Sequence, residues 1–286
     1  MQEVHWCAIG DSFTYLNDHL DETGFRVHKG YLTRTCERFV NLQVQNLGIN
    51  GSRTGDWLTA PLAAADVYTV LLGTNDWFAE VPLGITEDFS MRREGSILGN
   101  LGCLIGRLRE TAPSAPVLVM TPVERGDFVY LFDADNHAHG SYAPCAGRML
   151  SEVAAGIAAA CRAAGISVLD LHEKTGITPE NAVRFKRVRT PEGYRDLPYP
   201  AYLGIPVRFG EDENPYPPQA QDYTYDGLHP SDKGNEVIAA LLAAELEEIM
   251  RKSGKPLGRK TEFVQNQIRY ESAYGRLCAG LQNTQP

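Results

Sequence analysis

The sequence predicts an α/β fold built around a parallel β-sheet. Short, mostly apolar runs alternate with longer segments of helical character along most of the chain, and this alternation is typical of repeated strand–helix units. Each run is short and mostly apolar, as expected of strands that helices cover on both faces. A chain of 286 residues with 43% hydrophobic residues can bury one such core.

Five apolar runs are expected to form the strands of this sheet. They are residues 4–9, 42–46, 67–72, 117–120 and 167–171.

Helices are expected between and after these strands, at residues 29–39, 96–110, 148–164 and 231–251. The last is the clearest, because Pro230 precedes it and Ser231 or Asp232 can cap it. Its apolar residues also recur at helical spacing: Val237, Ile238, Leu241, Leu242 and Leu246.

Two stretches, at about residues 122–144 and 175–225, break this rhythm and are rich in aromatic and polar residues. Long irregular insertions in a compact domain are usually functional or disordered, and aromatic content argues against disorder. We therefore expect a single domain over residues 1–251 whose insertions wall a pocket, the second insertion with a hairpin. Residues 252–286 are expected to form a C-terminal tail or an extra helix.

The net charge of −9 argues against a nucleic-acid partner, since phosphate binding relies on a positive field. No apolar run reaches the roughly 18 residues that a membrane span needs. The first residues lack the features of a leader peptide, and the six cysteines contain no CxxC pair. We expect a cytoplasmic protein, or a secreted or periplasmic one if a leader has been removed.

The first candidate for chemistry is Ser12, in the turn Gly10-Asp11-Ser12 directly after the first strand. Open α/β sheets bind ligands at the carboxyl ends of their strands. A serine hydroxyl needs a base to become a nucleophile. Tyr225-Asp226-Gly227-Leu228-His229 supplies that base before the last helix, and Asp226 can orient its imidazole.

A tetrahedral intermediate also needs hydrogen-bond donors for its oxyanion. Two turns can supply them: Gly51 lies in the loop after the second strand, and Asn75 follows the third strand in Gly73-Thr74-Asn75-Asp76. Each such donor can contribute roughly 3–4 kcal/mol in the transition state. Asp11 and Asp76 are expected to hold the loops beside these residues rather than to act chemically.

These four blocks, in this order, resemble the signature blocks of the SGNH hydrolases, the GDSL-type esterases and lipases. The resemblance covers about residues 4–250. It implies a three-layer α/β/α sandwich, SGNH or flavodoxin-like, with a five-stranded parallel sheet. It also implies Ser12 as nucleophile with His229 and Asp226 as partners, and no metal or organic cofactor. The oxyanion hole would be Ser12 N–H, Gly51 N–H and the Asn75 amide.

The chain departs from the family pattern in two places. Phe13 stands where the name-giving motif has leucine, and the two insertions match no family block. Because members of the family are esterases, lipases, thioesterases and carbohydrate deacetylases, the substrate does not follow from the resemblance.

Four aromatic or imidazole side chains are candidates for substrate contact: Trp57, Trp77, His137 and His139. For the tryptophans, core packing is the default reading. The histidines lie in an acidic run whose carboxylates and imidazoles could together bind a metal ion, although such a run is more often a hydrated surface loop. The basic run Arg184, Lys186, Arg187 and Arg189 reads as a solvated face, or as a border for an anionic or sugar-like group.

The sequence thus predicts an enzyme that cleaves a carboxylic ester through an acyl-enzyme, with a small-molecule substrate such as an acetylated carbohydrate. Two alternatives remain open, namely an acyltransferase with the same residues and a non-catalytic ligand-binding module on the same fold.

Overall fold

A central sheet of five parallel strands organises the computed structural model, which describes residues 2–133, 135–208 and 212–261. Its strands lie in the order β2-β1-β3-β4-β7. Their bounds are Val4–Gly10 for β1, Leu42–Asn46 for β2, Val67–Leu71 for β3, Val117–Met120 for β4 and Ser167–Leu169 for β7. All five predicted strands are therefore present, and the predicted parallel α/β fold is confirmed.

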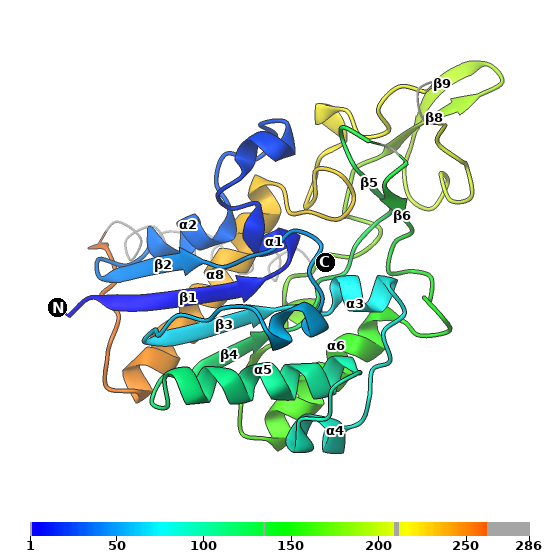
Figure 1. The fold of residues 1–286 in the computed structure, drawn as a ribbon. Coiled ribbons are helices and arrows are strands. Elements are labelled where there is room, and N and C mark those ends of the chain that lie inside the picture. Colours follow the sequence, from blue (N-terminus) through cyan, green and yellow to red (C-terminus); the bar gives the residue numbers. More distant parts are fainter. Residues whose placement is uncertain (1, 134, 209–211, 262–286) are drawn as a thin grey trace, which may run out of the picture.

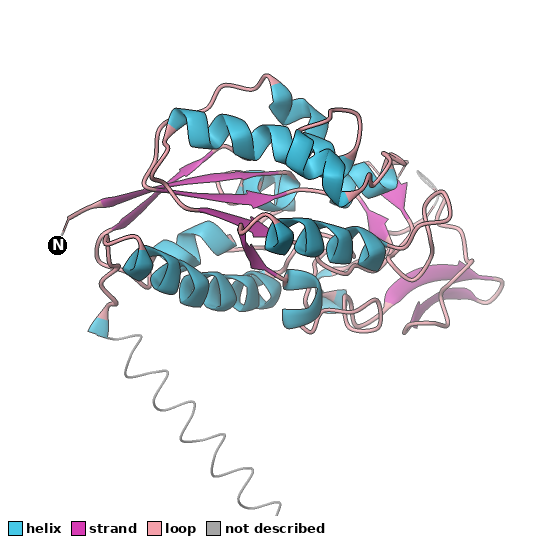
Figure 2. Ribbon diagram, turned by 90° about the horizontal axis from the view of Figure 1, so that it is seen from below, coloured by secondary structure: helices cyan, strands magenta, loops and turns pink. Residues whose placement is uncertain are grey.

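Helices cover both faces of the sheet, so the molecule has three layers (Figure 2). Helices α2 (Tyr31–Cys36) and α8 (Asp232–Lys252) pack on one face, and α5 (Ile97–Thr111) and α6 (Leu150–Ala163) on the other. Strand β1 shows why its sequence is apolar on consecutive positions from Trp6 to Ile9. Trp6 and Ala8 belong to the first core and Cys7 and Ile9 to the second.

Some element bounds differ from those predicted. Helix α2 is shorter than the helix predicted over residues 29–39: it starts after Gly30 and ends at Cys36. Strand β7 ends before residue 170, since the side chain of Asp170 caps the next helix, α7 (Leu171–Lys174), by accepting from Glu173 N–H.

Short helices follow the strands where the sequence shows no periodicity. They are α1 (Ser12–Tyr15), α3 (Thr74–Phe78) and α4 (Thr86–Met91), with 3₁₀ turns at Leu20–Thr23, Thr54–Leu58 and Pro218–Ala220. Segments this short cannot display a 3.6-residue repeat, which explains why the sequence did not predict them.

The two insertions gather beyond the carboxyl ends of the strands, at the upper right of Figure 1. The first contains an antiparallel ribbon of β5 (Phe128–Val129) and β6 (His137–Ala138). The second contains the predicted hairpin, formed by β8 (Lys186–Thr190) and β9 (Gly193–Leu197).

After α8 the chain returns to the first layer, where Val40 N–H donates to Gly258 O at 2.8 Å. The rest of the predicted tail, residues 262–286, lies outside the described residues. In the described part of the chain, every helix is too short or too polar to cross a bilayer.

Candidate active site

Ser12 stands at the first turn of α1, immediately after β1. Asp11 caps this helix, its carboxylate accepting from Phe13 N–H at 3.1 Å. The turn is tight because Gly10 has no side chain, and a Cβ there would lie 2.0 Å from Thr14 Oγ1. Ser12 is thereby held at the carboxyl edge of the sheet with 5% of its surface exposed.

His229 meets Ser12 from the loop that precedes α8. Its Nε2 lies 2.8 Å from Ser12 Oγ, and its Nδ1 lies 2.6 Å from Asp226 Oδ2. Asp226 is fully buried, and its Oδ1 accepts from the backbone N–H groups of Leu228 and His229. The three side chains that the sequence singled out thus form one continuous line of hydrogen bonds.

Aromatic rings enclose the His229 imidazole. Phe128 presents its edge at a centroid distance of 5.4 Å, while Tyr225 stacks at 6.0 Å and Phe13 lies at 5.9 Å. Phe13, the residue that departs from the family motif, is therefore part of the wall around the histidine. Such packing limits the rotation of the imidazole and leaves it few orientations besides the one facing Ser12.

The two predicted oxyanion donors lie on loops that follow β2 and β3. Gly51 has φ of 72°, in the left-handed region, and a Cβ there would meet nothing within 4 Å. Asn75 is half-buried, and its Nδ2 donates one hydrogen bond to Ser52 O at 3.1 Å. An amide nitrogen has two hydrogens, so the second remains for another acceptor.

Asp76 and Asp11 hold the backbone around these donors, as the sequence suggested. Asp76 is fully buried and accepts from both the backbone N–H and the hydroxyl of Thr54, which joins the two loops. Burial raises the pKa of Asp76, an effect that the Thr54 bonds only partly offset. Burial likewise raises the pKa of Asp11 to about 7, although Phe13 N–H and His229 favour its ionised form.

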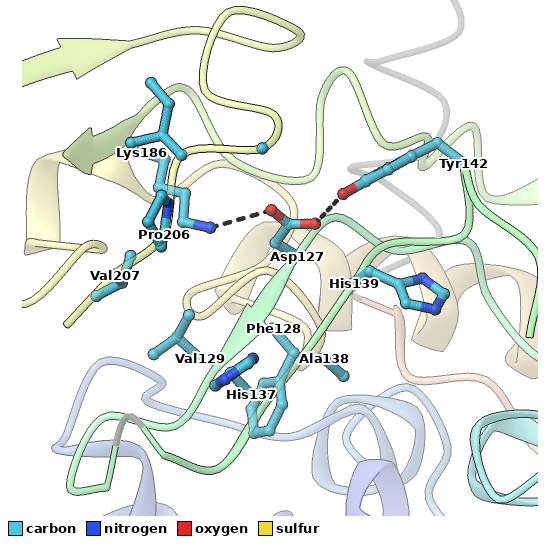
Figure 3. Close-up of a pocket in the computed structure, with 12 residues that line it drawn as sticks. Asp127, Phe128, Val129, His137, Ala138, His139, Tyr142, Lys186, Pro206 and Val207 are labelled. Atoms are coloured by element: carbon cyan, nitrogen blue, oxygen red, sulfur yellow. Dashed lines mark hydrogen bonds and ion pairs between the residues drawn. The ribbon is translucent and has the colours of Figure 1, made fainter. Parts of the chain in front are cut away.

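Two cavities lie at this end of the molecule. A cavity of about 140 Å³ contains His229 and is otherwise lined by Leu16, Glu22, Asn50, Phe128, Tyr130, Asn136 and Tyr225. A larger one of about 290 Å³ is lined only by residues of the two insertions, with Asp127 at its centre (Figure 3). The insertions therefore do wall a pocket.

The four candidates for substrate contact divide between pocket and core. His137 and His139 line the larger cavity. Trp57 and Trp77 are each 1% exposed and lie in the core between the sheet and α5. Their indole nitrogens donate to Ser52 Oγ and Arg148 O, so neither ring is open to a ligand in this structure.

The basic run is not a single solvated face. Lys186 turns inward to Asp127 at 3.0 Å, whereas Arg187 pairs with Asp196 and Arg189 with Asp212.

Within the described ranges, no three His, Cys, Asp or Glu side chains gather as metal ligands would.

Sequence reasoning missed two side chains next to the site, Phe128 and Arg125. The guanidinium of Arg125 is buried against the rings of Trp77 and Phe78 at 5.9 and 5.8 Å, and it donates to His139 O. Burial lowers its pKa to about 10, while Asp226, Cys145 and Asp127 act in the opposite direction. No local pattern marks either residue, because both lie in an insertion without periodicity.

Comparisons with known proteins show which family this chain resembles. The model of the GDSL-like Lipase/Acylhydrolase family matches residues 8–237. A crystal structure described as a "possible lipase" from Chitinophaga pinensis DSM 2588 is 43% identical, with a TM-score of 0.83; the match covers 88% of this chain and 100% of the other.

A second solved structure, from Lactobacillus plantarum, shares the fold. It is 23% identical with a TM-score of 0.54, and the match covers 87% of this chain and 98% of the other. A search of curated proteins gives no match.

Proposed function

Since this chain belongs to the GDSL-like lipase/acylhydrolase family and is thus a carboxylic ester hydrolase, we propose that Ser12 is its nucleophile, with His229 as base and Asp226 as the partner of His229. The observation that carries this proposal is the continuous hydrogen-bonded line from Asp226 through His229 to Ser12 Oγ. A nucleophile, a base within hydrogen-bond reach and a third group that orients the base together define this chemistry.

In the acylation step, His229 Nε2 accepts the hydroxyl proton as Ser12 Oγ attacks the ester carbonyl carbon. Asp226 accepts from Nδ1–H and stabilises the imidazolium that forms. When the tetrahedral intermediate collapses, the carbon–oxygen bond to the alcohol breaks and His229 gives its proton to the leaving oxygen. Water then repeats the sequence on the acyl-enzyme and releases the acid.

The carbonyl oxygen gains negative charge in each tetrahedral intermediate. We assign its stabilisation to the backbone N–H groups of Ser12 and Gly51 and to the second Nδ2–H of Asn75. Asn75 is already oriented by its bond to Ser52 O, so the donor is in place before charge develops.

The substrate that we propose is an ester of a small acyl group, such as acetyl, on a carbohydrate. The cavity beside His229 supports this choice, because polar side chains such as Glu22, Asn50 and Asn136 line it together with two tyrosines. A hydroxylated alcohol can hydrogen-bond to these groups, whereas a long alkyl alcohol would leave them unpaired.

Labelling with a fluorophosphonate tests the proposed nucleophile without knowledge of the natural ester. We expect one equivalent of label on Ser12, located by mass spectrometry of peptides, and none on Ser12→Ala. A label on another residue would refute the assignment. A protein that takes no label would instead be a ligand-binding module on this fold. Product analysis with an added alcohol acceptor separates hydrolysis from acyl transfer.

A further inference from the structure

The cavity of about 290 Å³ between the two insertions has a polar floor and mostly apolar walls. On the floor, Lys186 and Tyr142 approach Asp127 from opposite sides (Figure 3). The walls come from the β5–β6 ribbon and from residues 204–207. Small-molecule sites typically combine apolar walls with a few convergent polar groups, and this cavity is near the lower end of their size range.

The floor is built from buried ionised groups. Lys186 Nζ lies 3.0 Å from Asp127 Oδ2, and the two side chains are 7% and 13% exposed. Tyr142 donates to Asp127 Oδ1 at 2.5 Å, and Gly140 N–H donates to the same oxygen at 3.1 Å. Burial alone would raise the pKa of Asp127, but Lys186 and Tyr142 together hold it below the usual value.

Charge balance restricts the ligand that this floor can take. Because the ammonium and the carboxylate already neutralise each other, a ligand with a net charge would meet one repulsive partner. A carboxylate has about four lone-pair sites and an ammonium three hydrogens, so both keep hydrogen-bonding capacity beyond their mutual contact. Adjacent hydroxyls of a neutral diol match this arrangement, since one can donate to Asp127 while its neighbour accepts from Lys186.

Phe128 connects this cavity with the catalytic site, because Phe128 lines both cavities and its ring edge lies 5.4 Å from the His229 imidazole. The segment that carries it, residues 126–129, also holds the loop of His229. Val129 N–H donates to Asp226 O at 3.1 Å and Gly126 N–H donates to Gly227 O at 2.8 Å. In the proposed reaction His229 protonates the leaving alcohol, so the alcohol lies on the side of His229.

We propose that this cavity is a subsite for the alcohol part of the substrate, and that Lys186 and Asp127 recognise adjacent hydroxyls of a neutral polyol there. The inference rests on the proposed function, which places the alcohol beside His229. It assigns specificity to residues of the two insertions rather than to the signature blocks.

The test compares two acetate esters whose alcohols carry rings of the same size. The alcohol of 6-O-acetyl-D-glucose has ring hydroxyls, and that of cyclohexylmethyl acetate has none. A site built to bind hydroxyls discriminates strongly against an analogue that lacks them. We expect kcat/KM of the native protein to favour the glucose ester by about tenfold or more. Equal values for the two esters would overturn the proposal.

Two variants locate the origin of this preference. Val207→Trp fills the cavity from its wall and keeps the ion pair. The double variant Lys186→Met, Asp127→Asn removes both charges, so that neither is left buried without its partner. In both variants we expect the ratio of kcat/KM for the glucose ester to kcat/KM for the cyclohexylmethyl ester to fall close to one. Arg195→Gln, which changes an exposed cation on β9, is the matched control and should keep the preference. Full preference in a folded Val207→Trp protein would overturn the subsite.

Ser12→Ala separates this inference from the function on which it rests. Hydrolysis of p-nitrophenyl acetate that survives in Ser12→Ala would refute the nucleophile. Hydrolysis that depends on Ser12 but shows no preference for the polyol ester would refute the subsite alone.

Discussion

Asn75 is the side chain whose role can be tested most cleanly at the scale of a single residue. Its Nδ2 bonds to Ser52 O and leaves one N–H for the oxyanion. We expect Asn75→Ala to lower kcat by about a hundredfold or more, with a loss of unfolding free energy of only about 1 kcal/mol. Steady-state kinetics and denaturant titration measure the two effects.

Asn75→Asp is the control for shape. It keeps the size of the side chain but replaces the amide donor with an acceptor, so we expect it to lose as much activity as Asn75→Ala. Activity close to that of the native protein in either variant would remove Asn75 from the oxyanion hole.

The buried carboxyl of Asp11 makes the free energy of unfolding depend on pH. Burial raises its pKa to about 7, while the unfolded chain releases this proton near pH 4. The folded state therefore binds more protons than the unfolded chain between these pH values. The resulting contribution to the free energy of unfolding is fully present below about pH 4 and is lost as the pH rises through about 7. Relative to Asp11→Asn, we expect the native protein to lose up to about 4 kcal/mol across this window.

Chemical unfolding at several pH values measures this difference. Asn can still cap α1, so the variant changes the titration and keeps the hydrogen bond to Phe13 N–H. A difference between the native protein and Asp11→Asn that stays constant or grows with pH would contradict the account.

At the scale of elements, the start of β5, with Asp127 just before it, packs closely against the loop of His229 at Gly227. A Cβ at Gly227 would lie 1.7 Å from Asp127 O, and its φ is 92°. We expect Gly227→Ala to lower both the melting temperature and kcat on p-nitrophenyl acetate, because the loop must move away from β5 and carry Asp226 with it.

Gly193→Ala is the matched control, since Gly193 also has a positive φ of 119° but nothing lies within 4 Å of its Cβ. It should lose some stability from backbone strain and keep its kcat. Equal kcat in the two variants would show that contact between β5 and this loop does not position the catalytic residues.

The elements also show what a sequence can predict. The strands were found because continuous apolar runs such as β3 reflect burial on both faces. The β5–β6 ribbon was not found, since four paired residues leave no repeat. Lys186 was read as part of a solvated basic run, yet its partner Asp127 lies 59 positions away, and no local pattern reveals a contact at that separation.

At the scale of the whole molecule, the fold brings together residues that are far apart in the chain. Ser12 and His229 are separated by 217 positions. Their hydrogen bond exists because β1 ends, and α8 begins, at the same edge of the sheet. The four ordered blocks predicted this meeting. The insertions indicated a pocket at this edge, but the number of cavities and the side chains that line them depend on how the insertions fold over it.

Hydrolysis of p-nitrophenyl acetate by the native protein and by Ser12→Ala, measured side by side, is the most direct test of the central claim. The account predicts that Ser12→Ala loses turnover by at least about three orders of magnitude, while its melting temperature stays close to that of the native protein. Activity retained by a folded Ser12→Ala protein would contradict it, and the reaction would then have to be assigned to another nucleophile.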